Sequence, residues 1–231
     1  MTIKILNLYA GIGGNRKLWD GDIEVTAVEN NKIIAEIYKK FFPNDKVIVG
    51  DAHKFLLEHY KEFNFIWSSP PCQSHSRVRK ATLPRGLTKP VYPDMKLYQE
   101  ILFLKHHVEA TPWVVENVKP YYEPLIEPQS VGRHNFWCNF EIKPINFTLQ
   151  GDLIGSSKIK LLEENKGFNL DFARGLGKRK DQVLKNCVNA ELGNHIFKCA
   201  FASRQEILPD FIGDDVNEEG YIGTITPEVK G

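Results

Sequence analysis

The chain lacks several features that would assign it to a specialised class. Its four cysteines include no Cys-x-x-Cys pair, so their spacing predicts no structural zinc site. It has no apolar run of membrane length and no signal peptide, so we expect a cytoplasmic protein with reduced thiols, without a metal or a membrane anchor. The formal net charge is only +1, so overall charge identifies no partner.

Charge is nevertheless distributed unevenly along the chain. Six cations and a single carboxylate lie within residues 72–96, whereas residues 206–231 are acidic. The cations are Arg77, Arg79, Lys80, Arg85, Lys89 and Lys96. The basic run indicates a local anionic partner, with a solvated loop as the alternative, and the acidic run is interpreted as a solvated tail.

Apolar runs alternate with helical patterns through the first half of the chain. Strands are expected at Ile3–Tyr9, Ile23–Val28, Lys46–Val49, Phe63–Trp67, Trp113–Val115 and Phe136–Cys138. Helices are expected near Arg16–Trp19, Lys32–Phe42, His53–Tyr60 and Met95–His107. This alternation predicts an α/β fold with a doubly wound, mostly parallel, Rossmann-like sheet.

The pattern weakens in the second half, which predicts a division of the chain. Residues 1–142 are expected to form the main domain, and residues 143–181 a small lobe. Residues 182–203 regain apolar character and are expected to return to the main domain, and residues 204–231 form the acidic tail.

Chemically active residue types follow each expected parallel strand. In open parallel sheets, ligands bind outside the carboxyl ends of the strands. The residues in question are Gly11, Gly13 and Gly14, then Glu29, Asp51, Cys72 and Glu116. Together they predict one site along a single edge of the sheet.

The first of these strand ends suits a nucleoside. A glycine-rich turn lets a ligand approach the backbone, and Glu29 could accept hydrogen bonds from both ribose hydroxyls. Asp51 could accept from an adenine amine or simply cap the next helix. No Walker lysine follows the glycines, so a phosphate cradle is not favoured.

Cys72 follows a predicted buried strand and two prolines that fix the backbone. A thiol at a rigid strand end that opens a basic loop is suited to act as a nucleophile. The alternative for this residue alone is a small buried cysteine beside a turn.

Three motifs together carry a resemblance to a known family. They are Leu8-Tyr9-Ala10-Gly11-Ile12-Gly13-Gly14, Pro70-Pro71-Cys72-Gln73 and Glu116-Asn117-Val118. In order and spacing they resemble the C5-cytosine DNA methyltransferases, of the compact bacterial or phage kind, over roughly the first 140 residues. Near the end, Leu184–Val188 resembles the family's Gly-Asn-Ala-Val segment.

The resemblance implies S-adenosylmethionine as cofactor, double-stranded DNA as partner and residues 143–181 as the target-recognition region. It implies a catalytic set of Cys72, which adds to C6 of an extruded cytosine, Glu116, which contacts N3 and the amine, and Arg133. The implied cofactor-binding residues are Tyr9, Ala10, Gly11, Gly13, Gly14, Glu29, Asn30, Asp51, Ala52, Pro70, Leu97, Asn186 and Val188. The implied DNA-binding residues are Gln73, Ser76, Arg77, Arg79, Lys80 and Arg85.

The chain departs from the family pattern at several positions. Gln129–Arg133 retains one arginine of the usual Gln-x-Arg-x-Arg element, Asn30 stands where an aromatic is common, and Lys185 replaces a glycine. The alternatives are therefore a transfer-RNA cytosine-5 methyltransferase of the same family and a catalytically silent DNA-binding module on this fold, with a nicotinamide oxidoreductase a distant third. A monomer is expected, with a dimer as the alternative.

Overall fold

The computed structural model describes residues 2–145 and 159–205. Its strands are β1 Ile3–Leu8, β2 Ile23–Glu29, β3 Lys46–Val49, β4 Phe65–Ser68, β5 Trp113–Val118, β6 Gln129–Val131 and β7 His134–Cys138. They form one seven-stranded sheet in the order β3-β2-β1-β4-β5-β7-β6. Strands β1 to β5 are mutually parallel and β7 runs antiparallel to both of its neighbours, which confirms the predicted doubly wound, mostly parallel sheet.

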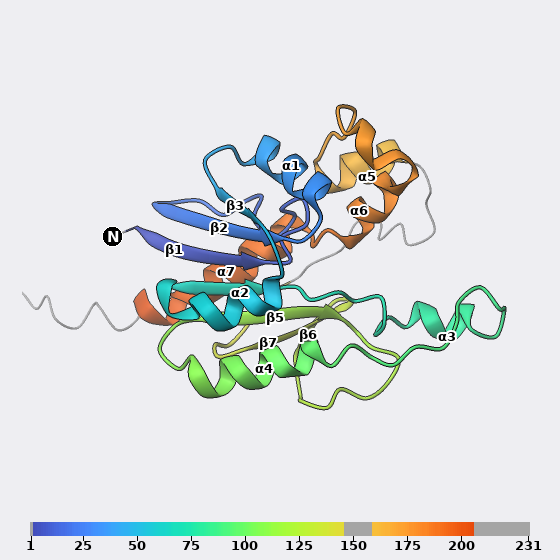
Figure 1. Ribbon diagram of the computed structural model, residues 1–231. Coiled ribbons are helices and arrows are strands. Elements are labelled where there is room, and N and C mark those ends of the chain that lie inside the picture. The colour runs from blue at the N-terminus through green and yellow to red at the C-terminus, as the bar shows by residue number, and fades with distance from the viewer. Residues whose placement is uncertain (1, 146–158, 206–231) are drawn as a thin grey trace, which may run out of the picture.

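Helices cover both faces of this sheet (Figure 1). They are α1 Lys32–Phe41, α2 Ala52–His59, α3 Val78–Thr82, α4 Lys96–His107, α5 Ile159–Lys166, α6 Lys180–Asn186 and α7 Ala190–Gln205, with short 3-10 turns η1 Tyr60–Glu62 and η2 Arg174–Arg179. Within the described ranges, no helix has both the length and the apolar character needed to cross a membrane.

The core follows from the alternation of side chains along β1. Leu6 and Leu8 face a cluster built with α2 and α4, whereas Ile5 faces the opposite cluster, which α7 covers. On that second face, Trp19 stacks on Phe197 of α7 with ring centroids 5.2 Å apart. Helix α7 therefore packs against this face of the sheet.

The described part of the second half packs beside the turn that follows β1. Ile12 of that turn and Ile37 of α1 share an apolar cluster with Leu162 of α5 and Leu184 of α6. Figure 1 shows α5 and α6 grouped next to α1. The domain boundary predicted at residues 181/182 falls inside α6. Residues 146–158 of the predicted lobe and 206–231 of the predicted tail lie outside the described residues.

The helix predicted near Arg16–Trp19 is wrong, because this segment forms turns. The Trp19 amide donates to the Arg16 carbonyl at 3.0 Å, and the Arg16 guanidinium donates back to the Trp19 carbonyl at 2.9 Å. A side chain that bonds to its own turn competes with helix formation.

Strand β5 is longer than predicted and contains Glu116 and Asn117 rather than ending before them. The extension follows from β7, which pairs Glu116 with Phe136 and Asn117 with Asn135. Strand β6 was not predicted, because three half-exposed residues give no periodic signal.

Candidate active site

A cavity of about 210 Å³ lies at the carboxyl edge of the sheet, at the switch point between β1 and β4. Its wall comes from the turn after β1, the end of β2, the segment after β4, strand β5 and residues 183–188. The predicted site residues that line it are Tyr9, Ala10, Gly11, Gly14, Glu29, Asn30, Pro70, Cys72, Gln73, Glu116, Asn186 and Val188. The structure thus brings the expected cofactor turn, thiol and carboxylate into one space.

The Gly11 backbone and the Glu29 carboxylate form one corner of the cavity. The Gly11 amide donates to Glu29 Oε2 at 3.0 Å, and the Asn31 amide donates to Glu29 Oε1 at 2.8 Å. Gly11 has φ of 56°, and a Cβ built there would meet no atom within 4 Å. Two backbone donors therefore fix the carboxylate, which keeps lone pairs for the hydroxyls of a guest.

Gly13 and Gly14 have different structural roles. A Cβ on Gly13, whose φ is 86°, would lie 2.3 Å from a ring carbon of Phe42, so this glycine lets the turn pack on α1. A Cβ on Gly14 would lie 2.5 Å from the Val188 carbonyl oxygen. Gly14 therefore lets the late segment close over the turn.

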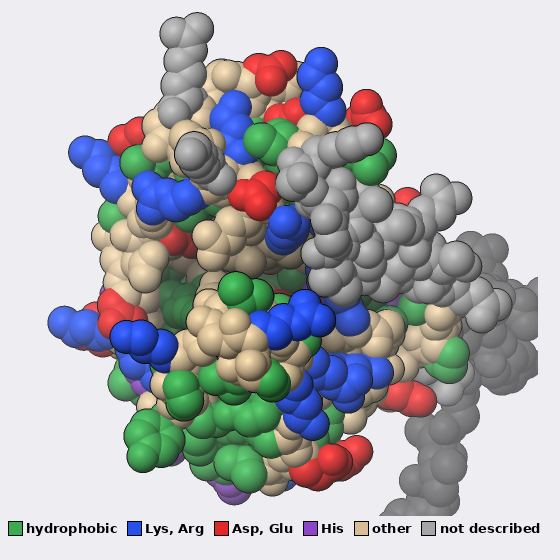
Figure 2. Space-filling view, turned by 90° about the vertical axis from the view of Figure 1, so that its right-hand side faces the viewer, with side chains coloured by type: hydrophobic (Ala, Val, Ile, Leu, Met, Phe, Trp, Pro, Cys, Tyr) green, Lys and Arg blue, Asp and Glu red, His purple; other side chains and the backbone are tan. Residues whose placement is uncertain are grey.

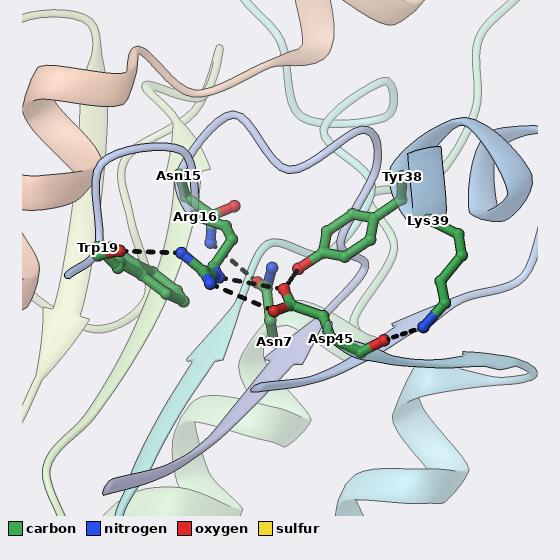
Figure 3. A network of polar contacts seen from close by, with 7 residues as sticks. All are labelled: Asn7, Asn15, Arg16, Trp19, Tyr38, Lys39 and Asp45. Atoms are coloured by element: carbon green, nitrogen blue, oxygen red, sulfur yellow. Dashed lines mark hydrogen bonds and ion pairs between the residues drawn. The ribbon is translucent and has the colours of Figure 1, made fainter. Parts of the chain in front are cut away.

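A polar network anchors the same turn from behind (Figure 3). Asn15 Nδ2 donates to Asn7 Oδ1 at 2.8 Å, and Arg16 Nε pairs with Asp45 Oδ2 at 3.0 Å. The Tyr38 hydroxyl donates to Asp45 Oδ2 at 2.7 Å. Burial and the adjacent Asp45 raise the pKa of Tyr38 well above its ordinary value, so it remains a donor.

A buried carboxylate, Glu100 of α4, joins the ends of β1 and β4 behind the cavity. The Tyr9 hydroxyl donates to its Oε1 at 2.5 Å, Ser68 Oγ donates to its Oε2 at 2.6 Å, and His53 Nδ1 lies 2.8 Å from Oε1. Tyr9 itself has φ of 54°, in the left-handed region. Sequence reasoning missed Glu100.

Cys72 also lines the cavity. The amides of His75 and Ser76 both donate to the Cys72 carbonyl at 3.0 Å, which forms a tight turn directly after the prolines. Burial and the nearby Glu116 raise the pKa of Cys72 from 9.0 to about 11, while Arg133 acts in the opposite direction. The resting group is therefore the neutral thiol at pH 7.

Glu116 has a partner that the sequence did not reveal. His134 Nδ1 lies 2.6 Å from Glu116 Oε1, and both residues are buried. Arg133 lies immediately before, in the turn between β6 and β7 that Gly132 begins with φ of 57°. Glu116 and His134 thus form a buried pair, and Arg133, which is not among the residues that line the cavity, acts electrostatically on Cys72.

Four predicted cofactor residues do not belong to the lining of the cavity. Gly13 faces α1, and Ala52 and Leu97 pack in the core. Asp51 caps α2 by accepting from the amides of His53 and Lys54 at 2.9 and 3.2 Å, which also lowers its pKa. For these four, cofactor contact remains a prediction. The lining residues that sequence reasoning missed are Ile12, Asn15, Ile34, Ser69, Pro71, Val183 and Cys187.

The basic segment after Cys72 projects from this edge of the sheet. Ser76 pairs with Pro120 as an isolated bridge, and Arg77 Nε donates to the Pro120 carbonyl at 3.3 Å. Arg79 is half-buried and donates to the Lys89 carbonyl, whereas Lys80 and Arg85 are exposed. In Figure 1 α3 points away from the sheet, and Figure 2, which views this side, shows Lys and Arg side chains gathered beside an apolar area.

The fold and the site together define a Rossmann-like α/β protein whose switch-point cavity holds a thiol and a carboxylate. Within the described ranges, no three potential metal-ligating side chains form a group that could hold an ion. The family model for C-5 cytosine-specific DNA methylases matches residues 3–121, which include β1 to β5 and both Cys72 and Glu116. The chain belongs to this family.

Known relatives include enzymes with an RNA substrate in their names. A tRNA (cytosine(38)-C(5))-methyltransferase from Homo sapiens is 23% identical over 269 residues, which cover 95% of this chain and 68% of that protein. The enzyme of the same name from Spodoptera frugiperda is 37% identical over 87 residues, 35% of this chain and 26% of its own length. The chain thus matches about a quarter of the insect protein.

Two solved structures also show similarity to this chain. A DNMT2 variant from Spodoptera frugiperda has 26% identity and a TM-score of 0.40, covering 53% of this chain and 38% of that one. The Entamoeba histolytica methyltransferase EhMeth has 13% identity and a TM-score of 0.49, covering 88% of this chain and 99% of that one.

Proposed function

We propose that this protein is a DNA (cytosine-5)-methyltransferase that uses S-adenosylmethionine. The observation that carries the proposal is that Cys72 and Glu116 line the same cavity as the glycine turn and Glu29. A methyl donor bound at the glycine turn and a pyrimidine bound at Cys72 would be neighbours in this cavity.

The chemistry of the cavity wall fits a nucleoside cofactor. Glu29 offers a fixed carboxylate for ribose hydroxyls, and Gly11 leaves open space at the backbone. Asn30, Asn186 and Val188 line the same space and would complete the binding site. When bound there, S-adenosylmethionine would supply an electrophilic methyl group.

Cys72 would act as the nucleophile. Its thiolate adds to C6 of cytosine, which turns the electron-poor C5 into a nucleophilic carbon. The proton that leaves Cys72 would pass to Glu116, which in its protonated form donates to N3 while accepting from the exocyclic amine, and so offsets the negative charge that develops on the ring as the C–S bond forms. After C5 is methylated, loss of the C5 proton and departure of the Cys72 sulfur restore the aromatic ring.

The Cys72 thiol must lose its proton before it can add. The Glu116 charge opposes this loss and Arg133 favours it. A cytosine that engages the Glu116 carboxylate would weaken the first influence and leave the second. The nucleophile would therefore be activated when the base arrives, which protects the free enzyme from side reactions.

The nucleic acid would bind along the projecting basic segment. A stacked cytosine hides C6, so the target base must leave its helix to reach Cys72. Gln73, Ser76, Arg77, Arg79, Lys80 and Arg85 are the residues proposed to contact the DNA around it. Lys80 and Arg85 are exposed and free to meet phosphates, whereas Ser76 and Arg77 also fasten the segment to Pro120.

Transfer RNA is the second candidate substrate. The observation that favours it is that the curated relatives described above are named as tRNA cytosine-5 methyltransferases. The chemistry at Cys72 is the same for both substrates. Only the surface that holds the polynucleotide differs, so a substrate comparison separates them.

The decisive measurement is transfer of a labelled methyl group from S-adenosylmethionine to duplex DNA and, in parallel, to total tRNA. We expect 5-methylcytosine in the DNA. Digestion of the DNA with DNase before the assay should abolish this signal. Labelling of tRNA alone would overturn the DNA assignment and support the second candidate. The absence of product with both polymers would contradict both enzyme assignments and support a catalytically silent DNA-binding module.

We predict that Cys72→Ser abolishes methyl transfer, because a hydroxyl is a far weaker nucleophile, while cofactor binding measured by calorimetry is retained. Cys138→Ser is the matched control, since its thiol donates to the Phe140 carbonyl away from the cavity and should leave turnover unchanged. Covalent trapping on 5-fluorocytosine DNA should occur with wild type and not with Cys72→Ser. Full turnover by Cys72→Ser would remove the thiol from the mechanism.

A further inference from the structure

The pairing of Glu116 with His134 is the feature of the site that neither the motifs nor the relatives assign. In the antiparallel pair of β5 and β7, Glu116 lies opposite Phe136 and Val118 lies opposite His134. Because Glu116 and Val118 are two residues apart on a strand, the His134 side chain is on the same face as Glu116. His134 Nδ1 is 2.6 Å from Glu116 Oε1.

Both partners of this contact are buried, so the Glu116 carboxylate depends on the protein for its hydrogen-bond donors. The exposed fractions are 5% for His134 and 6% for Glu116, and the imidazole also lies against the Phe136 ring at 6.2 Å between centroids. A buried carboxylate without a donor is costly, and a flexible Glu side chain would have several rotamers. The histidine supplies the donor and fixes one rotamer.

We propose that His134 is a positioning residue for the methyl transfer, an inference that rests on the proposed function. By holding Oε1, it leaves the second oxygen of Glu116 for the pyrimidine edge. The same hydrogen bond keeps the Glu116 carboxyl group in place while its charge changes during the reaction.

Arg133 and His134 are adjacent in the sequence but act on different groups of the site. Arg133, in the β6–β7 turn, acts on the Cys72 thiol, and His134, the first residue of β7, acts on Glu116. The family pattern of two arginines is reduced to one in this chain, and His134 is the basic side chain that the structure sets beside the catalytic carboxylate.

The test uses His134→Phe, which keeps a ring of similar size and removes the donor, and His134→Asn, whose Nδ2 takes the place of imidazole Nδ1. We expect His134→Phe to lower kcat by about 10- to 100-fold, the range for a lost hydrogen bond to a charged group, with cofactor Kd unchanged. His134→Asn should recover most of kcat. The rate of covalent trapping on 5-fluorocytosine DNA should fall and recover in parallel.

If His134 had only a structural role, its loss would change stability and cofactor affinity but not kcat. Both variants would then lose thermal stability and cofactor affinity together, with kcat within about twofold of wild type, and that result would overturn the inference. If His134→Phe does not fold, His134→Ala with added imidazole replaces it, and failure of imidazole to restore turnover counts against the inference. Wild type is measured alongside: an inactive wild type overturns the proposed function together with this inference, whereas active wild type with active His134→Phe overturns this inference alone.

Discussion

At the scale of the residue, the reactivity of Cys72 depends on two neighbours of opposite charge. With a pKa of about 11, only about one molecule in a thousand carries the thiolate at pH 8. Burial is the largest cause, the Glu116 carboxylate adds to it, and Arg133 opposes both. The proposed nucleophile is therefore mostly a neutral thiol in the free protein, and a change at either neighbour would shift its pKa.

We expect Glu116→Gln to lower the pKa of Cys72 below 11, because the substitution removes a negative charge, but not to its ordinary value of 9.0, because burial remains. Arg133→Ala should raise the pKa. Both are measured from the pH dependence of iodoacetamide alkylation, followed by mass spectrometry of the peptide that contains Cys72. An unchanged alkylation profile in both variants would show that neither side chain acts on the thiol.

At the scale of the element, the wall of the cavity depends on the contact between the turn after β1 and the segment before α7. Gly14 has room only for hydrogen, since Val188 O and Cys187 Cβ would lie 2.5 and 3.0 Å from an added Cβ. A similar close approach recurs one element further on, where a Cβ on Gly193 of α7 would lie 2.5 Å from the Asn15 carbonyl oxygen. Glycines thus join two segments that are far apart in the sequence.

We predict that Gly14→Ala weakens S-adenosylmethionine binding by at least about tenfold and destabilises the fold by about 1–3 kcal/mol, the usual range for overpacking. The control is Gly50→Ala, because the nearest atom to its added Cβ is 3.8 Å away. Calorimetry gives the affinity and thermal unfolding gives the stability. Equal behaviour of the two variants would contradict a close contact at Val188.

The parallel part of the sheet could be predicted from the sequence because apolar strand patterns recur from β1 to β5, and helices separate each pair of successive strands from β2 onward. Likewise, Cys72 and Glu116 could be placed in one site because both follow from strand order. The sequence did not predict three contacts of the site and its surroundings. They are the hydrogen bonds of Arg16 to Trp19, of His134 to Glu116, and of Tyr9 and Ser68 to Glu100. The His134 and Glu100 contacts join residues that become neighbours only after strands and helices have packed, whereas the Arg16 contact is local but leaves no periodic pattern in the sequence.

At the scale of the whole molecule, Glu100 links pH to global stability. His53 of α2 pairs with this buried carboxylate, and the hydrogen bond to Glu100 raises the pKa of His53 above its ordinary value of 6.5. Protons therefore bind the folded protein more tightly than the unfolded chain. The resulting stabilisation is fully present below about pH 6.5, the unfolded value, and is lost as the pH rises through the higher folded value.

We expect His53→Ala to be less stable than wild type by the largest margin below about pH 6, with the difference shrinking at alkaline pH. Denaturant unfolding at several pH values measures it. His59→Ala is the control, because its partner Glu62 is 62% exposed and the pair contributes little. If the stability difference between wild type and His53→Ala grew with pH, protonation of His53 would not stabilise the fold.

The close fit of Gly14 against Val188 also bears on how the protein is made in a cell. A ribosome adds about 5–20 residues per second, so the partner of Gly14 is synthesised roughly 10 to 35 seconds after it. During that interval the nascent polypeptide has a glycine turn whose cover does not yet exist. A nascent chain that has not reached Val188 therefore lacks the contact that closes this part of the cavity wall.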